Sequence, residues 1–220
     1  FITLGGFVTF TLGSILTAAG CTITKVIMAF SFASALSLVV MAGAELFTGN
    51  NFVMAAASFQ KEVSWLDTLK LWVVCYLGNF VGAVILVALF QLGGVPKGAT
   101  GEYFATIAAG KMGGTASALF FKGMLCNMLV CLAVWCCTKM KTESGKLIMI
   151  FWCIYIFMAC GFEHSIANMS VMAVGLLNGA GVEGVSIAGY FHNLLWVTLG
   201  NVAGGALLVA FPYYIIQKEK

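Results

Sequence analysis

The sequence predicts an all-α integral membrane protein with six transmembrane helices in two inverted three-helix repeats, the second and fifth helices being broken. Hydrophobic residues make up 61% of the chain, charged residues make up 9%, and mean hydropathy is +1.03, so the chain belongs in lipid. Its apolar runs are much longer than ten residues and do not alternate with polar positions, which favours helices over a barrel. A polar motif also occurs twice, once in each half.

Span length divides the chain, because a helix needs about 20 apolar residues to cross the hydrocarbon core. The expected spans are residues 2–19, 26–59, 69–92, 116–137, 147–177 and 193–216. The second and fifth runs are too long for one crossing and contain the polar motif, so we predict a helix, an irregular loop and a second helix in each. The segment between the third and fourth spans, with Lys97 and Lys111, is expected to be a connecting loop.

The motif starts at Glu45 in the first half and at Glu163 in the second, 118 residues later. Asn50 matches Asn168, and each copy ends in Val-Met. Ionisable groups are costly in hydrocarbon, so a duplicated polar insert predicts two broken helices that meet around a polar path. This arrangement is typical of a pore or a carrier.

The duplication extends beyond the motif. Residues 78–88 resemble 200–210, and residues 24–28 resemble 145–149, at nearly the same spacing. Chance similarity between apolar helices is the alternative explanation. A repeat with an odd number of spans places its partner upside down in the membrane, so two such halves form an inverted repeat with the pathway between them.

We therefore expect one transmembrane domain over residues 1–220, with the first repeat at about 1–92 and the second at about 111–217. Each repeat also carries a pair of glycines four residues apart, which is expected at close helix contacts. These pairs are Gly78 with Gly82 and Gly200 with Gly204.

Lysine distribution predicts the orientation, because cytoplasmic loops are enriched in basic residues. One side of the predicted topology carries Lys61, Lys70, Lys139, Lys141, Lys146, Lys218 and Lys220. The other side carries Lys25, Lys97 and Lys111, so we expect a multi-pass protein of the cytoplasmic (inner) membrane with both termini in the cytoplasm. The net charge of +3 and the absence of a basic run argue against nucleic acid as a partner.

His164 lies inside the fifth run, beside the second motif. A histidine within a membrane span is a functional candidate. Its ordinary pKa of about 6.5 allows proton exchange with a weak acid near neutral pH. Alternatively, its two nitrogens only satisfy backbone groups that the helix break exposes.

The two glutamates and two asparagines of the motif are candidates for loop bracing, because a broken helix frees backbone amides that a carboxylate can accept. They are Glu45, Glu163, Asn50 and Asn168. A cation site at the two carboxylates is the alternative, and it predicts an ion-gradient-coupled carrier.

Three further polar residues are candidates for substrate contact. Thr48 and Asn127 lie within apolar segments, where each is expected to bond a substrate or His164. Lys111 precedes the fourth span, where its charge either attracts anions or anchors the helix at the membrane surface. The apolar side chains that flank the breaks, candidates for pore constrictions, are Phe32, Leu36, Phe47 and Phe157.

Other functional classes have weaker support. The Asn-Pro-Ala pair of a water or glycerol channel is absent, although a neutral-solute channel remains an alternative. Most of the eight cysteines lie in apolar segments, and Cys136-Cys137 has no acid/base or cofactor motif beside it. We therefore expect no enzyme, no cofactor and no metal site. Because Phe1 already lies in an apolar run, the natural N-terminus is expected to be missing.

Four stretches together resemble the formate/nitrite transporter family. They are Gly-Ala-Glu-Leu-Phe-Thr at 43–48, the segment at 127–135, Gly-Phe-Glu-His-Ser-Ile-Ala-Asn-Met at 161–169 and Val-Thr-Leu-Gly-Asn at 197–201. The resemblance covers essentially the whole chain and is most specific at 161–169. It implies an aquaporin-like protomer, a homopentamer with one pore per protomer, and conduction of formate, nitrite or hydrosulfide. The chain looks closest to the hydrosulfide channel branch.

The resemblance also implies roles for individual residues. It makes His164 the central pore histidine, with Thr48 and Asn127 as its polar neighbours, and it makes Lys111 a vestibule lysine. One constriction is implied at Phe32 and Phe157, with Leu36 near the centre. The other constriction is implied at Leu46, Phe47 and Val130. A second vestibule lysine of the family is not in this chain, and Trp196 replaces a proline of the formate channels. Transient protonation through His164, or hydrogen bonds to the bare anion from Thr48 and Asn127, would lower the barrier to crossing.

Overall fold

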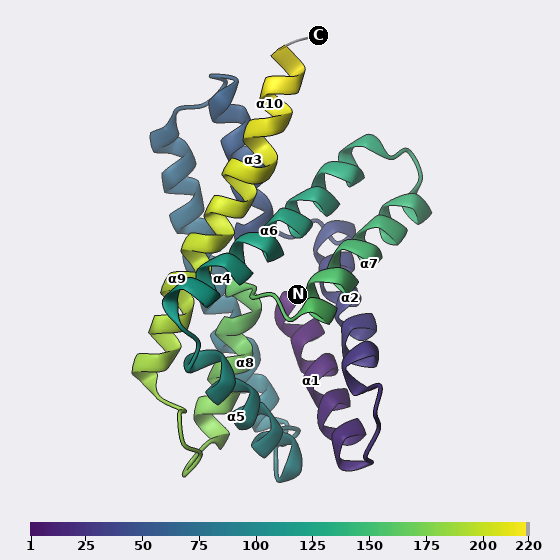
Figure 1. Ribbon diagram of the computed structural model, residues 1–220, viewed down its shortest axis with the longest axis vertical. Helices are drawn as coiled ribbons and strands as arrows, with labels where there is room; N and C mark the ends of the chain where they lie inside the picture. The colour runs from purple at the N-terminus through teal and green to yellow at the C-terminus, as the bar shows by residue number, and fades with distance from the viewer. Residues whose placement is uncertain (219–220) are drawn as a thin grey trace.

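The computed structural model describes residues 1–218, all of them in helices or in the connections between helices (Figure 1). The α-helices are α1 (Ile2–Ala18), α2 (Thr24–Met41), α3 (Phe47–Phe59), α4 (Trp65–Leu92), α5 (Ala99–Met112), α6 (Ala116–Lys139), α7 (Glu143–Cys160), α8 (Ser165–Asn178), α9 (Ile187–Gly205) and α10 (Phe211–Lys218). A π-helical turn, Ala206–Ala210, joins α9 to α10. Lys220, used in the orientation argument, lies outside the described residues.

Within residues 1–218, five helical segments are long and apolar enough to cross a membrane. They are α2, α4, α6, α7 and the continuous segment Ile187–Lys218. Helices α1 and α8 are apolar but shorter.

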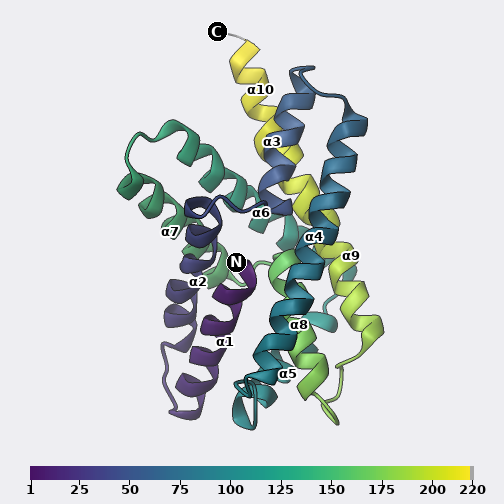
Figure 2. The same cartoon turned by 180° about the vertical axis from the view of Figure 1, so that it is seen from behind.

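Two interruptions divide the long apolar runs. Helix α2 ends at Met41 and α3 begins at Phe47, while α7 ends at Cys160 and α8 begins at Ser165. Both interruptions lie near the middle of the long axis of the molecule (Figures 1 and 2). The two polar motifs therefore lie about midway along the length of the molecule.

Helices α4 and α9 begin four and six residues earlier than the apolar runs indicated. The Ser64 hydroxyl accepts the backbone N–H of Asp67 at 3.1 Å, and the Ser186 hydroxyl accepts that of Gly189 at 3.0 Å. Such caps stabilise a helix start by about 1 kcal/mol. Each start is therefore set by a capping serine rather than by the first apolar residue.

The expected loop between the third and fourth spans is wrong, because α5 occupies most of it. Helix α5 has 14 residues, too few for one crossing, so a criterion based on span length misses it. Phe104, Ala105 and Ala108 form its buried face, and α5 packs along α8 (Figure 1). Lys111 is thereby fixed in the last turn of a helix.

The two glycine pairs differ in how closely another helix packs against them. A Cβ atom at Gly200 or Gly204 would overlap the backbone of α6, so these glycines allow α9 and α6 to pack backbone to backbone. A Cβ atom at Gly78 or Gly82 would meet nothing within 4 Å. The expected close contact is therefore found for the second pair, whereas for the first pair it is not made within this chain and stays a prediction.

Candidate functional site

His164 caps the helix that follows the second interruption. Gly161 ends α7 in the left-handed conformation, with φ of +73°, which a residue without a side chain adopts at little cost. His164 then sits at the N-cap of α8, where its Nδ1 accepts the backbone N–H of Ala167 at 3.1 Å. The imidazole is 3% exposed, so helix geometry fixes its position and orientation in the interior.

The structure brings His164 and Thr48 together from the two interruptions. His164 Nε2 lies 3.0 Å from Thr48 Oγ1, in the first turn of α3. Because a backbone N–H only donates, Nδ1 must be the accepting nitrogen, and the neutral ring carries its proton on Nε2. Nε2–H therefore donates to Thr48, and the Thr48 hydroxyl keeps its own proton for another acceptor.

The first interruption is braced by two asparagines. Asn50 Nδ2 donates to Glu45 Oε2 at 2.7 Å. Asn79, from α4, donates to the Glu45 carbonyl at 3.0 Å and accepts the Phe47 backbone N–H at 3.0 Å. We expected the Glu45 carboxylate to accept a backbone amide freed by the break. It instead bonds the Asn50 side chain, and the freed Phe47 amide bonds Asn79.

The second interruption repeats this arrangement. Asn168 Nδ2 donates to Glu163 Oε2 at 2.6 Å. Asn201, from α9, donates to the Glu163 carbonyl at 3.1 Å and accepts the Ser165 backbone N–H at 2.9 Å. Sequence reasoning did not single out Asn79 or Asn201 as site residues. The signal was present in the matched Gly-Asn pairs of the two halves.

The second interruption differs from the first by an ion pair. Lys111 Nζ lies 2.8 Å from Glu163 Oε2, and the two side chains are 17% and 9% exposed. Asn193 accepts from Asn168 at 2.8 Å and donates to the Lys111 carbonyl at 2.8 Å, which ties α5 to the break. Lys111 thus neutralises a buried carboxylate, whose isolated charge would cost several kcal/mol.

Asn127 is buried close to this network, but the structure does not bond it to His164 or Thr48. Its Nδ2 donates to Asn51 Oδ1 at 3.1 Å and to the Asn201 carbonyl at 2.7 Å. Asn127 therefore lies next to Asn201, the asparagine that braces the break, and its contact with a substrate stays a prediction.

The apolar candidates lie in one buried cluster, and one of them, Phe157, lies beside His164. The rings of Phe32 and Phe157 meet edge to face with centroids 5.7 Å apart, and the Phe157 ring lies nearly parallel to the imidazole with centroids 6.1 Å apart. The remaining expected constriction residues, Leu36, Leu46, Phe47 and Val130, are all buried in the same apolar cluster.

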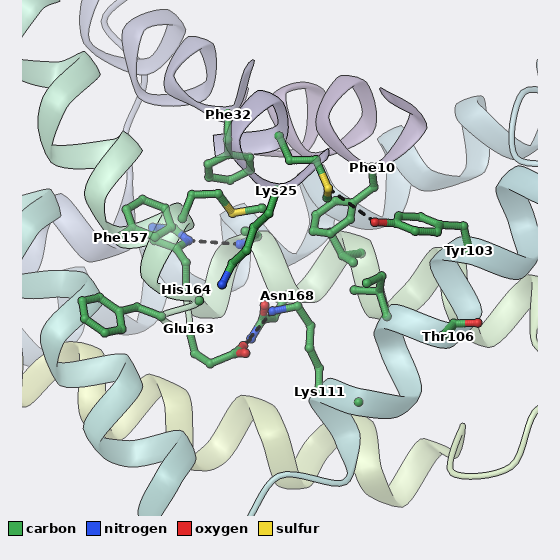
Figure 3. A pocket seen from close by; sticks show the side chains of 18 of the residues that line it. Phe10, Lys25, Phe32, Tyr103, Thr106, Lys111, Phe157, Glu163, His164 and Asn168 are labelled. Carbon is green, nitrogen blue, oxygen red and sulfur yellow. Dashed lines mark hydrogen bonds and ion pairs between the residues drawn. The ribbon is translucent and has the colours of Figure 1, made fainter. Parts of the chain in front are cut away.

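A cavity of about 450 Å³ adjoins this site and is lined by residues of α1, α2, α5, α7 and α8 (Figure 3). Phe32, Phe157 and His164 line it together with Lys25 and Lys111. Among residues 1–218, no three His, Cys, Asp or Glu side chains are placed to hold a metal ion. The cavity lining includes the lysines, the Glu163 carboxylate, the hydroxyls of Thr24, Tyr103 and Thr106, and aromatic rings.

Comparison with known proteins identifies the family of this chain. The sequence model described as formate/nitrite transporter matches residues 1–215. The nitrite transporter NirC of Escherichia coli (strain K12) is 39% identical over 222 residues, covering 97% of this chain and 78% of that protein.

Two solved structures also match. One, titled FNT family ion channel, has a TM-score of 0.90 and 35% identity over 98% of this chain and 85% of that chain. The other, titled pentameric formate channel with formate bound, has a TM-score of 0.84 and 26% identity over 98% of this chain and 93% of that chain. These matched proteins are transporters and channels rather than enzymes. This chain belongs to the formate/nitrite transporter family and is an integral membrane protein.

Proposed function

We propose that this chain is a channel for small monovalent weak-acid anions, with hydrosulfide, formate and nitrite as candidate substrates. The observation that carries the proposal is the cavity that ends at a neutral His164, bonded to Thr48 and enclosed by Phe32 and Phe157. The names of the matched nitrite transporter and formate channel support two of these substrates. Hydrosulfide stands first because of the resemblance noted in the sequence.

The proposed architecture is one domain of six spans in two inverted repeats, assembled as a homopentamer in the cytoplasmic membrane with both termini inside. The matched roles of Asn79 and Asn201 support the repeat, since each asparagine bonds the glutamate carbonyl and the first amide of the following helix. The match to a structure titled pentameric supports the assembly.

In the proposed mechanism the anion enters the cavity and loses water at the Phe32 and Phe157 edges. His164 Nε2–H then turns its hydrogen bond from Thr48 to the anion, and the free Thr48 proton supplies a second bond. A relay through doubly protonated His164 is disfavoured, because a proton on Nδ1 would break the cap with Ala167. Asn127 acts indirectly in this scheme, because both of its donor hydrogens are already bonded.

Stopped-flow uptake into proteoliposomes tests the proposal, with formate, nitrite and hydrosulfide as substrates and chloride and glycerol as controls. His164→Asn is the sharpest variant, because asparagine still caps a helix but lacks the Nε2–H. We expect wild-type uptake of the weak-acid anions to be fast and uptake in His164→Asn to fall at least about tenfold, the equivalent of one strong hydrogen bond.

Three results would contradict the proposal. Rapid glycerol uptake would identify a neutral-solute channel. Uptake only under an imposed sodium or proton gradient would identify a coupled carrier, centred on Glu45 and Glu163. Equal uptake in wild type and His164→Asn would remove the histidine from the pathway.

A further inference from the structure

The cavity that leads to His164 is lined by three charged side chains, Lys25, Lys111 and Glu163. The charges of Lys111 and Glu163 cancel, because the ammonium and the carboxylate form a largely buried ion pair at 2.8 Å. The residual positive charge of the cavity is therefore carried by Lys25. A cavity with low-dielectric walls focuses such a charge on approaching ions.

Lys25 is placed to act on a solute inside the cavity. It lies in the first turn of α2, and its side chain crosses toward the second interruption (Figure 3). Its Nζ is 4.0 Å from the position that a Cβ atom would take on Gly161. The ammonium thus lies over the end of α7, three residues before His164.

Within residues 1–218, Lys25 is the lysine of the cavity that forms neither a hydrogen bond nor an ion pair, whereas Lys111 is paired with Glu163. The hydroxyls of Thr24, Tyr103 and Thr106 donate to Cys21 O, Met28 Sδ and Glu102 O, respectively. The amide of Asn168 is shared between Glu163 and Asn193. Lys25 forms no ion pair with these residues, because the described part of the chain has two ion pairs and neither includes it.

We propose that Lys25 captures the anion in this cavity and that Lys111 is a positioning residue that holds Glu163 and the second interruption. The inference rests on the proposed anion-channel function and assigns the recruiting charge within it. A flexible ammonium on an exposed helix end attracts a monovalent anion without holding it tightly. The anion therefore passes on to the His164 Nε2–H.

Lys25→Gln tests the assignment in stopped-flow formate uptake by proteoliposomes. At low ionic strength, where charges act over about 30 Å, we expect uptake to fall about fivefold relative to wild type. At physiological ionic strength, where the range is about 8 Å, the difference should shrink to less than twofold. Lys25→Arg should behave as wild type. Lys97→Gln removes the same charge from an exposed position that does not line the cavity, and it should change nothing.

The double variant Lys111→Gln with Glu163→Gln removes the ion pair and leaves the net charge of the cavity unchanged. Whatever its absolute rate, it should keep the wild-type dependence of uptake on ionic strength. A lost salt dependence in the double variant, or an intact one in Lys25→Gln, would overturn the proposal and return the recruiting role to Lys111.

A binding measurement separates this inference from the function on which it rests. Formate should raise the apparent melting temperature of detergent-solubilised wild type and of the double variant, but not of Lys25→Gln. If wild type takes up none of the anions, the channel function is refuted, and this thermal shift alone decides the role of Lys25. An equal shift in Lys25→Gln and wild type would refute the capture site.

Discussion

At the scale of single residues, His164 has a structural role as the N-cap of α8 and, in the proposed mechanism, a chemical one. Its Nδ1 replaces the capping group that α8 needs after the break, and this bond directs the other ring nitrogen to Thr48. A serine or aspartate would cap the helix equally well but would not present an N–H across the gap. The helix start thus fixes the tautomer that the proposed mechanism requires.

Thr48 should contribute through its hydroxyl rather than through its shape. Thr48→Val keeps the volume but leaves His164 Nε2–H without its acceptor and removes the second donor to the anion. We expect weak-acid uptake to fall about tenfold in Thr48→Val and to stay within about twofold of wild type in Thr48→Ser, which keeps the hydroxyl. Stopped-flow uptake measures both, and equal rates in the two variants would show that the hydroxyl takes no part.

The bracing asparagines should differ in their contribution to stability. Asn201 is fully buried and bonds the Glu163 carbonyl and the Ser165 N–H, as well as the Gly123 carbonyl, which keeps its helical bond inside α6. Asn201→Ala therefore leaves two buried polar groups unpaired, at about 1–3 kcal/mol each. Asn79 is partly exposed and serves two groups. Thermal unfolding in detergent should show a much larger loss of apparent melting temperature for Asn201→Ala than for Asn79→Ala. Equal losses would mean that burial does not set the cost.

The site residues themselves could be predicted from the sequence, but their contacts could not. A glutamate, a histidine and an asparagine inside apolar runs are costly, so Glu163, His164 and Asn168 stand out in the sequence without a structure. The pairing of Asn201 with a backbone amide 36 residues away depends on how α9 packs, and no local pattern encodes it. For the same reason, the sequence does not predict the ion pair in which Glu163 neutralises the Lys111 charge.

At the scale of helices, apolar length predicted most of the elements and failed where another force dominated. Helix α5 is too short to cross a membrane, and packing on α8 rather than length makes it a helix. The starts of α4 and α9 depend on capping serines that precede the apolar residues. Hydropathy reports burial in lipid, and these features arise from contacts within the protein.

The contact between α6 and α9 should be intolerant of a single added methyl group. In Gly200→Ala the Cβ would overlap the Phe120 carbonyl, which belongs to the backbone and cannot turn aside. Overpacking of this kind costs about 1–3 kcal/mol. We expect lower folded yield and a lower apparent melting temperature. Gly110→Ala is the matched control, because its Cβ meets nothing within 4 Å and alanine favours a helix. A wild-type melting temperature in Gly200→Ala would contradict the contact.

At the scale of the whole molecule, α4 is the least buried of the five described helical segments that are long enough to cross a membrane. Only a small part of it is buried, and Gly78 and Gly82 lie on it facing open space. Their counterparts in the second half, Gly200 and Gly204, are packed against a helix backbone. Small residues spaced four apart are typical of helix contacts in lipid. The face of α4 around Gly78 and Gly82 is therefore the surface that we expect a neighbouring protomer to cover in the proposed pentamer.

Gly78→Leu should separate assembly from folding. The added side chain meets no atom of its own chain, so the protomer should fold, while the bulk keeps a neighbouring helix from close approach. Native mass spectrometry of the detergent-solubilised protein should show pentamers for wild type and smaller species for Gly78→Leu. Val84→Leu adds apolar bulk at another exposed position of α4 and should remain pentameric. Intact Gly78→Leu pentamers would place the protomer contact elsewhere, and a wild type without pentamers would refute the proposed assembly itself.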